Sequence, residues 1–517
     1  MKKIISLFCI NVFLLSSVIA QTTGTVLFNN LQVHVIEINF SQIGYWNTLM
    51  SNKVYDDAND SSTYIPATVT VDGNLLDSVG IQLKGNSSYY NYPTNKKPFT
   101  LSFNEYISGQ QYDGLKSLNL NNGYQDPTMM REKLFLDFLN EKGLYAPRAN
   151  YAKLYLNGTY WGLYLMVERV NKTFCNDRFG NNGGNLFKGD NGSSACAKLE
   201  YHGVMAPYYN CYDLKTNTTA NDWTDLVNLT AQINNTTASQ FYDSVNAVMN
   251  TNSFIGAWAA CNLFSDFDSY SFRFQHNYYI YHNSSTDKFE WITWDVSTAF
   301  GTDIPQTVTQ IEANSVLYLV TPVTDKPLSN RMLSDSLFKQ NYLNTICDYA
   351  NNNFLPAVLF PKIDSIRNII DSAYYADPLK MYSNQNFDDN IDNTINLGYD
   401  ILGLKTFITN RSANVLNELA TLNVTCVNTG VNSVTPEENY FSVYPNPTND
   451  ILRMNFTGKY AFRKIRIINM LGESLKEENI FPENSPIDIS SLSSGIYFIQ
   501  LINQEGNITV TQKFIKE

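Results

Sequence analysis

Hydrophobic and polar positions divide the chain into three blocks. From residue 21 to about residue 300, short β-branched and aromatic runs predict strands, with two long helical interruptions. From about residue 303 to residue 425, apolar residues recur at spacings of three and four, which predicts helices. A polar linker at 426–438 precedes residues 439–517, whose brief apolar runs separated by Asn, Gly and Pro are typical of a small all-β sandwich. The predicted fold class is α+β.

The first twenty residues have the pattern of a secretory signal peptide. Lys2 and Lys3 precede an apolar run from Ile4 to Leu15, and Ala20 ends a small-residue cleavage site. The run is too short for a stable transmembrane anchor, and no later stretch reaches about 18 uninterrupted apolar residues. We therefore predict an exported protein that loses residues 1–20 and has no transmembrane segment.

Composition and charge narrow the choice of partners. The chain has 517 residues, 44% hydrophobic and 16% charged, which excludes a disordered or coiled-coil protein. A formal net charge of −12 makes nucleic acid and anionic membrane surfaces poor partners, so we expect no nucleic-acid binding. Six of the seven cysteines remain after the signal segment, which permits up to three disulfides in an exported chain. Their pairing stays open.

The candidate chemistry lies in residues 266–301. Two aromatic and β-branched runs, 277–281 and 288–294, flank a polar turn and predict a β-hairpin. If the turn centres near position 286, Asn277 lies opposite Asp295 at the open end, and cross-strand partners have Cβ atoms about 5 Å apart. An amide oxygen and a carboxylate at one point suit Mg²⁺, which completes its octahedron with phosphate oxygens and water.

Two further acids, Asp266 and Asp268, precede the hairpin in a loop. This order of acid, Asn, hairpin and second acid is that of a protein-kinase active site, where one Asp takes the hydroxyl proton and Asn and the second Asp hold metal. The kinase strings H-R-D, D-F-G and G-x-G-x-x-G are absent from the sequence. On these residues alone, an aromatic hairpin with solvated polar ends remains the alternative.

The N-terminal block offers residues that suit a nucleotide. The pattern of 126–142, which opens on an Asp-Pro pair, predicts a helix with Glu132 on its apolar stripe. A carboxylate there needs a cation, and a strand lysine would give the Lys–Glu pair that positions ATP phosphates in kinases. Lys84 and Lys97 are both candidates, and the sequence does not choose between them. An exposed Glu132 in a helix-surface ion pair is the alternative.

Glu168 closes a predicted hairpin of two Tyr/Leu-rich strands. Its turn, Asn157-Gly158, is a strong signal for a type I′ turn. The end of the second strand could place backbone against adenine as a hinge between two lobes. A capping or lobe-bridging ion pair of Glu168 is the other interpretation.

Six motifs follow one another along the chain: VTVDGNLLDSVGIQLKGNSS, KKPFTLSF, DPTMMREKL, LNGTYWGLYLMVE, HNYYIY and WDVSTAFG. Together they resemble the CotH family of spore-coat-protein-H-like atypical kinases, from roughly residue 30 to residue 420. The resemblance implies a two-lobed kinase-like fold, with a strand-rich N-lobe at about 21–170 and a helical C-lobe at about 171–425. It also implies phosphorylation of Ser/Thr in secreted or surface proteins, with ATP and Mg²⁺ (or Mn²⁺).

The resemblance assigns roles to individual residues. Asp268 takes the catalytic position, with Asp266 as its rival, and Asp295 and Asn277 take the metal positions. The nucleotide-binding candidates are Lys84, Lys97, Glu132 and Glu168. One departure matters: the family often has W-D-x-D before F-G, and here Ser297 replaces the second acid, which puts a second metal in doubt.

The last block carries three motifs of its own, VYPNP at 443–447, DISSLSSGIYF at 488–498 and QKFIK at 512–516. In this order they resemble the C-terminal sorting domain of the type IX secretion system. The resemblance implies the type IX machinery as a partner and export through the periplasm to the cell surface or the medium. An ordinary carbohydrate-binding or adhesive β module is the alternative.

These observations favour an exported atypical kinase that transfers the ATP γ-phosphate to protein Ser/Thr. The first alternative is a catalytically weak or inactive, kinase-like protein with a structural or adhesive role at the surface. The second is a glycan-acting enzyme that uses Asp266 and Asp268 as paired acids, for which carboxyl groups about 5–9 Å apart are needed.

Overall fold

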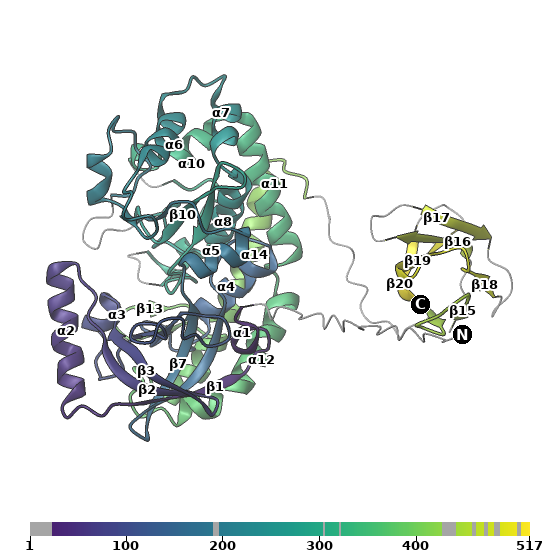
Figure 1. Ribbon diagram of the computed structural model, residues 1–517. Helices are drawn as coiled ribbons and strands as arrows, with labels where there is room; N and C mark the ends of the chain where they lie inside the picture. The colour runs from purple at the N-terminus through teal and green to yellow at the C-terminus, as the bar shows by residue number, and fades with distance from the viewer. Residues whose placement is uncertain are drawn as a thin grey trace, which may run out of the picture. The chain divides into compact units, whose positions relative to one another are not determined.

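The computed structural model describes residues 23–189, 196–302, 306–319, 322–426, 441–456, 462–469, 474–479, 486–503 and 508–517. The chain forms two compact units that divide between Asn428 and Thr429, shown in Figure 1. Both helices and strands are abundant, so the α+β prediction is confirmed. The predicted signal peptide at 1–20 and all of the predicted linker except Cys426 lie outside the described residues.

A closed seven-stranded barrel forms the N-terminal part of the first unit, in the order β1-β2-β3-β4-β5-β7-β6. Alternate residues of its strands point inward, as in β2, and fill an apolar interior. All neighbouring strands pair antiparallel except β1 and β6, which are parallel. The strands are β1 (Val33–Asn39), β2 (Ile65–Val71), β3 (Asn74–Leu83), β4 (Phe99–Ser102), β5 (Ser117–Asn121), β6 (Ala149–Leu156) and β7 (Thr159–Glu168).

The predicted turn at Asn157-Gly158 is confirmed. These two residues join β6 to β7 with φ of 47° and 76°, the left-handed values that a type I′ turn requires at both positions. The helices beside the barrel strands are α1 (Thr25–Phe28), α2 (Tyr45–Asn59), α3 (Ser87–Tyr90) and α4 (Arg131–Glu141).

Helix α4 starts later than predicted. Instead of capping a helix from residue 126, the Asp126 carboxylate accepts hydrogen bonds from the backbone N–H groups of Thr128 (3.0 Å) and Arg131 (2.8 Å). Met129 has φ of 57°, which no right-handed helix allows, so 126–130 form a turn and the prediction of a helix from 126 was wrong. The apolar side of α4 packs into the core of the helices that follow, with Phe135 stacked on Phe264 at 4.5 Å between ring centroids.

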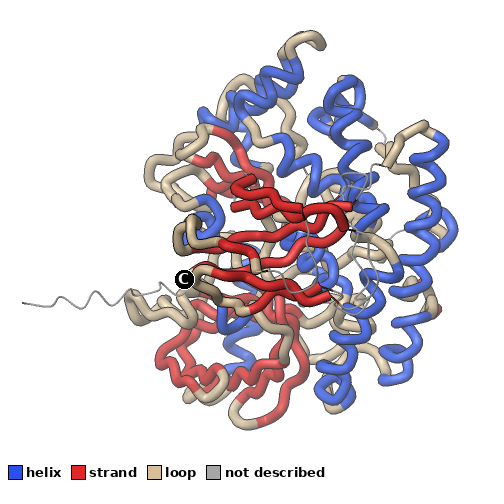
Figure 2. The backbone as a smooth tube through the Cα atoms, turned by 90° about the vertical axis from the view of Figure 1, so that its right-hand side faces the viewer, coloured by secondary structure: helices blue, strands red, loops and turns tan. Residues whose placement is uncertain are grey.

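Helices, drawn in blue in Figure 2, dominate the rest of the first unit, and Figure 1 shows most of them above the barrel. The predicted helical pattern from about residue 303 to residue 425 is confirmed by helices, among them α10, α11, α12 and α14. The helices are α5 (Lys172–Phe179), α6 (Thr224–Asn235), α7 (Phe241–Val248), α8 (Thr251–Leu263), α9 (Val308–Glu312), α10 (Pro327–Ser334), α11 (Ser336–Asn352), α12 (Pro356–Tyr375), α13 (Asn384–Asp392) and α14 (Leu404–Thr421), with short 3₁₀ turns η1 (Ala206–Asn210) and η2 (Val323–Asp325).

A small sheet of order β11-β10-β8-β9 is embedded among these helices. Its central strands are held by pairing of β10 with both β8 and β11. The strands are β8 (Leu186–Lys188), β9 (Asp213–Leu214), β10 (Tyr278–Asn283) and β11 (Lys288–Thr293), and a separate pair is β12 (Ile395–Asn396) with β13 (Asp400–Ile401).

The second unit consists of strands grouped in two sheets, β14-β15-β18 and β17-β16-β19-β20. Residues of both sheets, among them Leu452, Ile467 and Phe514, belong to one buried apolar cluster. The strands are β14 (Phe441–Tyr444), β15 (Ile451–Phe456), β16 (Phe462–Asn469), β17 (Ser474–Asn479), β18 (Ile487–Asp488), β19 (Gly495–Asn503) and β20 (Ile508–Lys516).

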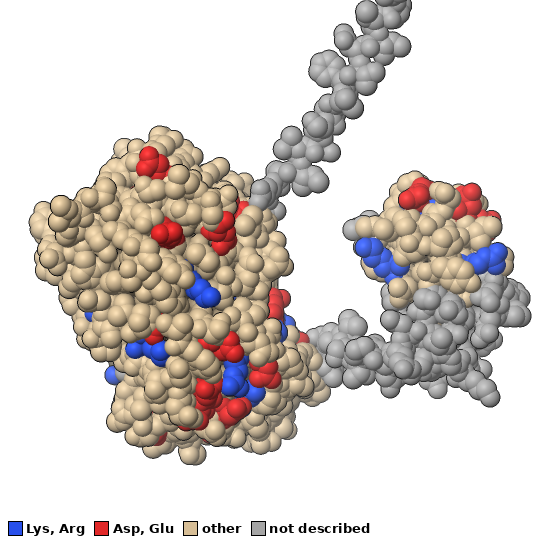
Figure 3. Space-filling view, turned by 90° about the horizontal axis from the view of Figure 1, so that it is seen from below, with Lys and Arg blue, Asp and Glu red and all other residues tan. Residues whose placement is uncertain are grey.

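Two disulfides, Cys196–Cys211 and Cys347–Cys426, cross-link the first unit, while Cys175 and Cys261 are buried free thiols. Among the described residues, none of the helices combines the length and the apolar composition that crossing a membrane demands. On the face drawn in Figure 3, acidic and basic side chains are interspersed over the first unit.

Candidate active site

The predicted hairpin is confirmed, but its register differs by one residue from the prediction. Tyr278 pairs with Thr293, and the backbone N–H of Trp294 donates to the carbonyl of Asn277 at 3.3 Å. Asn277 therefore lies opposite Trp294, and Asp295 is the next residue. The turn 284–287 contains four residues, so the hairpin centres between positions 285 and 286. Asn277 and Asp295 have φ of 61° and 50°, which turns both out of the strand ladder.

The loop 264–277, between α8 and β10, carries Asp268 and brings it to Asn277. The Asn277 side-chain amide donates to the backbone carbonyl of Asp268 at 2.7 Å and to its Oδ2 at 3.1 Å. Nε2 of His276 lies 2.6 Å from Oδ1 of the same carboxylate. The Asp268 side chain is nevertheless 32% exposed. Its carboxylate is thus held by two neighbours and still open to a substrate.

Asp266, two residues earlier, has the opposite environment. Its side chain is buried, accepts a hydrogen bond from Oγ1 of Thr298 at 3.0 Å, and lies 3.9 Å from the Cys261 sulfur. Burial, with smaller contributions from the charges of Asp268 and Asp295, raises its pKa well above the usual range for a carboxyl. Asp266 therefore favours the protonated, neutral form inside the protein.

Asp295 is exposed at the end of the hairpin, where the small sheet meets the barrel. Its Oδ1 accepts a hydrogen bond from Oγ of Ser297 at 3.1 Å. Its negative charge helps to raise the pKa of Glu132 and acts against the lowering of the pKa of Lys84 by burial. Asp295 is therefore close enough to Lys84 and Glu132 of the barrel part to interact with them electrostatically.

Lys84 and Glu132 are joined through Asn121, the last residue of β5. The Lys84 ammonium donates to the Asn121 side-chain oxygen at 2.9 Å, and the Asn121 amide donates to both Glu132 oxygens at 3.0 Å. Burial and the charge of Asp295 raise the pKa of Glu132 to about 7, and burial lowers the pKa of Lys84. The Lys84 nitrogen also lies 5.8 Å from the centroid of the Trp294 ring.

Lys97 is not brought to Glu132. Its buried ammonium donates to the backbone carbonyls of Tyr89 at 2.7 Å and Tyr92 at 2.9 Å. It therefore holds the chain around α3 against the start of β4. Its neighbour Lys96 forms a buried ion pair with Asp377 at 2.7 Å, which ties the barrel to the segment after α12.

Glu168, the last residue of β7, is buried in an ion-paired cluster. The Arg148 guanidinium donates to Oε1 at 2.6 Å and to Oε2 at 3.0 Å, and Arg178 of α5 donates to Oε2 at 2.8 Å. Both carboxylate oxygens are thus occupied by arginines from either side of the barrel's end. The ion-pair interpretation of Glu168 matches this geometry.

Three residues near the site escaped the sequence interpretation: Asn121, Lys188 and Arg169. Lys188 of β8 pairs with Tyr279 of β10, whose ring contacts the Trp294 ring at 5.7 Å in an edge-to-face arrangement. The positive charges of Lys188 and Arg169 help to lower the pKa of Lys84. Strand ends carry a weak signal for such residues, because Asn121 ends β5, Lys188 ends β8 and Arg169 follows β7.

The donors at the hairpin end fit a divalent cation that also binds phosphate. Among the described residues, His, Cys, Asp and Glu form no group of three or more that could hold a metal. Mg²⁺ needs only one or two protein carboxylates when substrate phosphates and water complete its octahedron. The Asp295 carboxylate and the Asn277 amide oxygen are hard oxygen donors of this kind. The charges of Asp268 and Asp295 both help to raise the pKa of Asp266, so the hairpin end carries negative charge that a cation would neutralise.

Comparisons with known proteins match two parts of the chain to different families. The sequence profile of the family described as CotH kinase protein matches residues 81–415, and that of the secretion system C-terminal sorting domain matches 442–517. The inner spore coat protein H of Bacillus subtilis (strain 168) is 27% identical over 326 residues, 63% of this chain and 85% of that protein. The crystal structure of the Helicobacter pylori proinflammatory kinase CtkA covers 66% of this chain and 94% of its own at 12% identity, and its TM-score of 0.29 is too low to carry an argument.

The two profile matches cover different parts of the chain and have different consequences. The C-terminal match is to a type IX sorting domain, which indicates export to the cell surface or secretion. The match at 81–415 spans well over half of the sequence and includes the end of β3, the barrel strands from β4 onward, α4 and the hairpin. The chain belongs to the CotH kinase protein family.

Proposed function

We propose that this protein is an exported atypical kinase that transfers the γ-phosphate of ATP to Ser/Thr of secreted or surface proteins with Mg²⁺ or Mn²⁺. In this proposal the barrel with α4 is the N-lobe, at about 21–170, and the helical part is the C-lobe, at about 171–425. The observation that carries it is the barrel's hydrogen-bonded chain Lys84–Asn121–Glu132, whose Lys84 ammonium lies 5.8 Å from the ring centroid of Trp294, the residue before Asp295.

The nucleotide phosphates would bind between this hydrogen-bonded chain and the hairpin end. The Lys84 ammonium is oriented by its hydrogen bond to Asn121, and the Asn121 amide is held in turn by Glu132. The ammonium is therefore already in place when a phosphate binds. Lys188 adds a second positive charge beside the Tyr279–Trp294 aromatic pair. This arrangement supplies the strand Lys and helix Glu that kinases use, with an amide placed between them.

Asp295 and Asn277 would hold the divalent cation. That cation, when bound, neutralises charge on the phosphate oxygens. Ser297 donates to Oδ1 of Asp295 and so orients the carboxylate. The amide nitrogen of Asn277 is used by Asp268, which directs the amide oxygen away from that bond.

Asp268 would accept the proton of the substrate hydroxyl. Its carboxylate is partly exposed and is oriented by Asn277 and by His276, so one oxygen can meet a serine or threonine Oγ. Asp266, by contrast, is buried away from any substrate, and its raised pKa favours the neutral form. We therefore assign acceptance of the substrate hydroxyl proton to Asp268 and a structural role within the loop to Asp266.

Transfer of label from γ-labelled ATP tests the proposal. The full chain is incubated with labelled ATP and Mg²⁺ or Mn²⁺, alone for self-phosphorylation and with a Ser/Thr-rich acceptor protein. We expect metal-dependent labelling that falls by about 10²- to 10⁴-fold in Asp268→Asn, the usual contribution of a general base. Asp266→Asn is the matched control, because its amide mimics the neutral acid, and it should retain most activity.

The alternative is a kinase-like surface protein with a structural or adhesive role and weak or no transfer. The observation in its favour is Ser297, which stands where the family often has a second acid. A wild-type protein that neither binds nor turns over ATP with either metal would establish this alternative. If Asp266→Asn abolished transfer and Asp268→Asn did not, Asp266 would be the proton acceptor in place of Asp268.

A further inference from the structure

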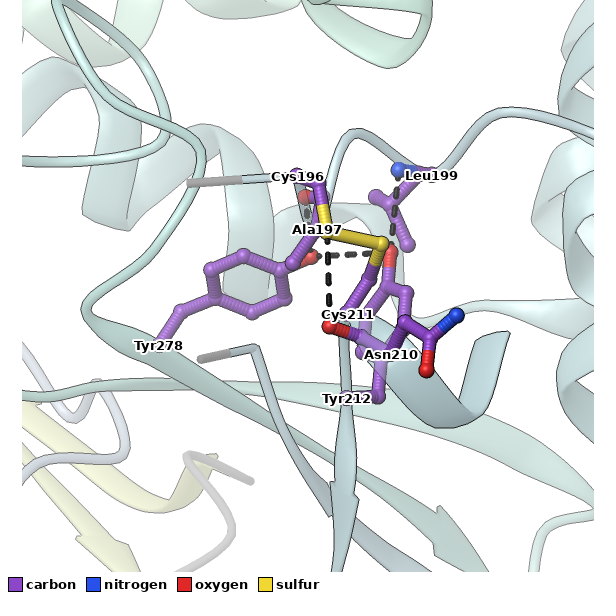
Figure 4. Close-up of a disulfide and its surroundings, with 7 residues drawn as sticks. All are labelled: Cys196, Ala197, Leu199, Asn210, Cys211, Tyr212 and Tyr278. Carbon is purple, nitrogen blue, oxygen red and sulfur yellow. Dashed lines mark hydrogen bonds between the residues drawn. A yellow bond between two sulfur atoms is a disulfide. The ribbon is translucent and has the colours of Figure 1, made fainter. Parts of the chain in front are cut away.

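The disulfide Cys196–Cys211 closes a segment that lies against the 264–277 loop. Figure 4 shows the bridge with Ala197, which follows Cys196, and Tyr212, which follows Cys211, and with the Tyr278 hydroxyl reaching toward both. Cys196 and Ala197 belong to neither helix nor strand, while Cys211 follows the 3₁₀ turn η1. The bond to Cys211 therefore fixes a stretch of backbone that secondary structure does not.

This stretch makes three hydrogen bonds to the loop and to the first residue of β10. The backbone N–H of Ala197 donates to the carbonyl of Gln275 at 3.1 Å, and its carbonyl accepts from the Tyr278 hydroxyl at 2.7 Å. The carbonyl of Lys198 accepts from the Tyr270 hydroxyl at 3.1 Å. Tyr270 lies two positions after Asp268, and Gln275 and Tyr278 lie on either side of Asn277.

The other side of the bridge reaches the same point. The Tyr278 hydroxyl lies 3.2 Å from the hydroxyl of Tyr212, which also accepts a hydrogen bond from the backbone N–H of Leu199 at 3.0 Å. Both tyrosines are buried, so these bonds are shielded from water. Tyr278 is thus bonded to the chain on both sides of the disulfide.

A neighbouring lysine reinforces the same loop. The buried ammonium of Lys326 donates to the carbonyl of Phe274 at 2.5 Å, and Lys198 forms an ion pair with Asp325 at 2.8 Å. Two consecutive carbonyls of the loop, those of Phe274 and Gln275, are therefore held from outside, by Lys326 at the start of α10 and by Ala197.

We propose that the Cys196–Cys211 disulfide is a positioning element of the active site, which holds Asp268 and Asn277 in register through Ala197, Lys198 and Tyr212. The proposal rests on the proposed function of these two residues. A misplacement of about 1 Å at a reacting group costs on the order of 10²-fold in rate. Since disulfides persist in oxidising compartments, full activity would be confined to the exported protein.

The second disulfide provides a matched control. Cys347–Cys426 joins α11 to the chain after α14 and spans 79 positions, against 15 for Cys196–Cys211. The longer closed loop restricts the unfolded chain more, so its removal should cost more stability. Removal of Cys347–Cys426 should therefore cost more stability, whereas removal of Cys196–Cys211 should cost more activity.

The experiment compares the full chain with the double variants C196S/C211S and C347S/C426S. Metal-dependent ATP transfer is measured with its Mg²⁺ dependence, together with the urea midpoint and hydrogen exchange of residues 270–278. We expect C196S/C211S to lose about 100-fold in transfer, to need more Mg²⁺ for half-maximal rate, and to exchange faster at 270–278. C347S/C426S should have the lower urea midpoint but near wild-type transfer below its transition.

The outcomes separate this proposal from the proposed function. Equal transfer and equal exchange in C196S/C211S and in wild type would overturn the positioning role while leaving the kinase intact. Equal loss of transfer in both double variants, in proportion to their urea midpoints, would also overturn it, because the effect would then be one of stability. If none of the three proteins transferred phosphate, and hydrogen exchange at 270–278 were faster in C196S/C211S alone, the kinase function would be overturned. The positioning of the loop by the disulfide would be supported.

Discussion

Two acidic residues at the boundary between the barrel and the helices differ in how their charge is satisfied. Glu168 is buried, and both of its oxygens are bonded to the guanidinium groups of Arg148 and Arg178. Asp295 is exposed, Ser297 donates a hydrogen bond to one of its oxygens, and its negative charge acts on the pKa of Lys84 across the site. Both sit at strand ends, yet the first is neutralised by the protein itself and the second leaves capacity for a ligand.

The two candidate lysines differ in the same way. The ammonium of Lys97 is captured by two backbone carbonyls, whereas that of Lys84 is directed by Asn121 toward the side where Asp295 lies. A charged group whose hydrogen bonds are completed inside the fold stabilises structure. A charged group that is oriented but incompletely neutralised is suited to binding, because ligand charge completes it.

The largest expected effect concerns Asp295. Asp295→Ala should reduce phosphate transfer by at least about 1,000-fold, because a carboxylate that holds the catalytic cation contributes several kcal/mol to the transition state. The urea midpoint should change little, since the side chain is exposed. Initial rates with γ-labelled ATP check this.

The control is Asp287→Ala at the opposite end of the hairpin, where the side chain is 93% exposed. It should transfer phosphate like wild type. Comparable losses in both variants would mean that the hairpin as a whole, and not the acid at its open end, is required.

Glu168→Gln should produce the reverse pattern. Removing one charge leaves two partly buried arginines facing each other, which costs about 3–5 kcal/mol in the free energy of unfolding. Transfer measured well below the unfolding transition should persist. Urea denaturation and initial rates of the same preparation give both numbers, and a nucleotide-contact role for Glu168 would instead raise the KM for ATP at unchanged stability.

The pH dependence of stability should reveal Glu132. Its pKa is raised to about 7 in the folded protein by burial and by Asp295, so the folded state binds a proton more tightly than the unfolded state. The stabilisation is complete below about pH 4.5 and is lost as pH rises through 7. Relative to Glu132→Gln, wild type should lose at most about 3 kcal/mol between these values.

Urea denaturation of both proteins at pH 4.5, 6 and 7.5 measures that difference. A difference that stays constant over this range would contradict a neutral, buried Glu132. It would also contradict an effect of the Asp295 charge on Glu132.

The smallest expected effect concerns Lys188. Lys188→Met should raise the KM for ATP about tenfold with little change in kcat, because one charge-assisted contact to phosphate is worth roughly 1.5–3 kcal/mol at most. Lys215→Met is the matched control, since the side chain of this lysine is 40% exposed and ion-paired with Asp213. Equal KM values in the two variants would exclude Lys188 from the phosphate site.

Local patterns were sufficient to predict much of the fold. The aromatic and β-branched runs 277–281 and 288–294 gave the hairpin of β10 and β11, and Asn157-Gly158 gave the turn type of the β6–β7 hairpin. The periodic apolar residues from about 303 to 425 gave helices, among them α10, α11, α12 and α14. These features depend on neighbours along the chain. The start of α4 was wrong, because the Asp126 carboxylate bonds to the backbone of Thr128 and Arg131 across a turn, in competition with a helix cap.

The site required information that the sequence does not carry locally. The register of Asn277 and Asp295 depended on whether the turn holds an odd or even number of residues, which the polar run 283–287 leaves open. The choice between Lys84 and Lys97 depended on carbonyls of Tyr89 and Tyr92 and on Asn121, set by the barrel's closure. Long-range packing decides such contacts, and no short-range pattern encodes them.

A crystal structure of the full chain with Mg²⁺ and a non-hydrolysable ATP analogue tests the central claim most directly. We expect the cation about 2.1 Å from an oxygen of Asp295 and from the amide oxygen of Asn277, with analogue phosphates beside Lys84 and the γ-phosphate facing Asp268. A nucleotide bound elsewhere, or a cation that leaves Asp295 uncoordinated, would contradict it.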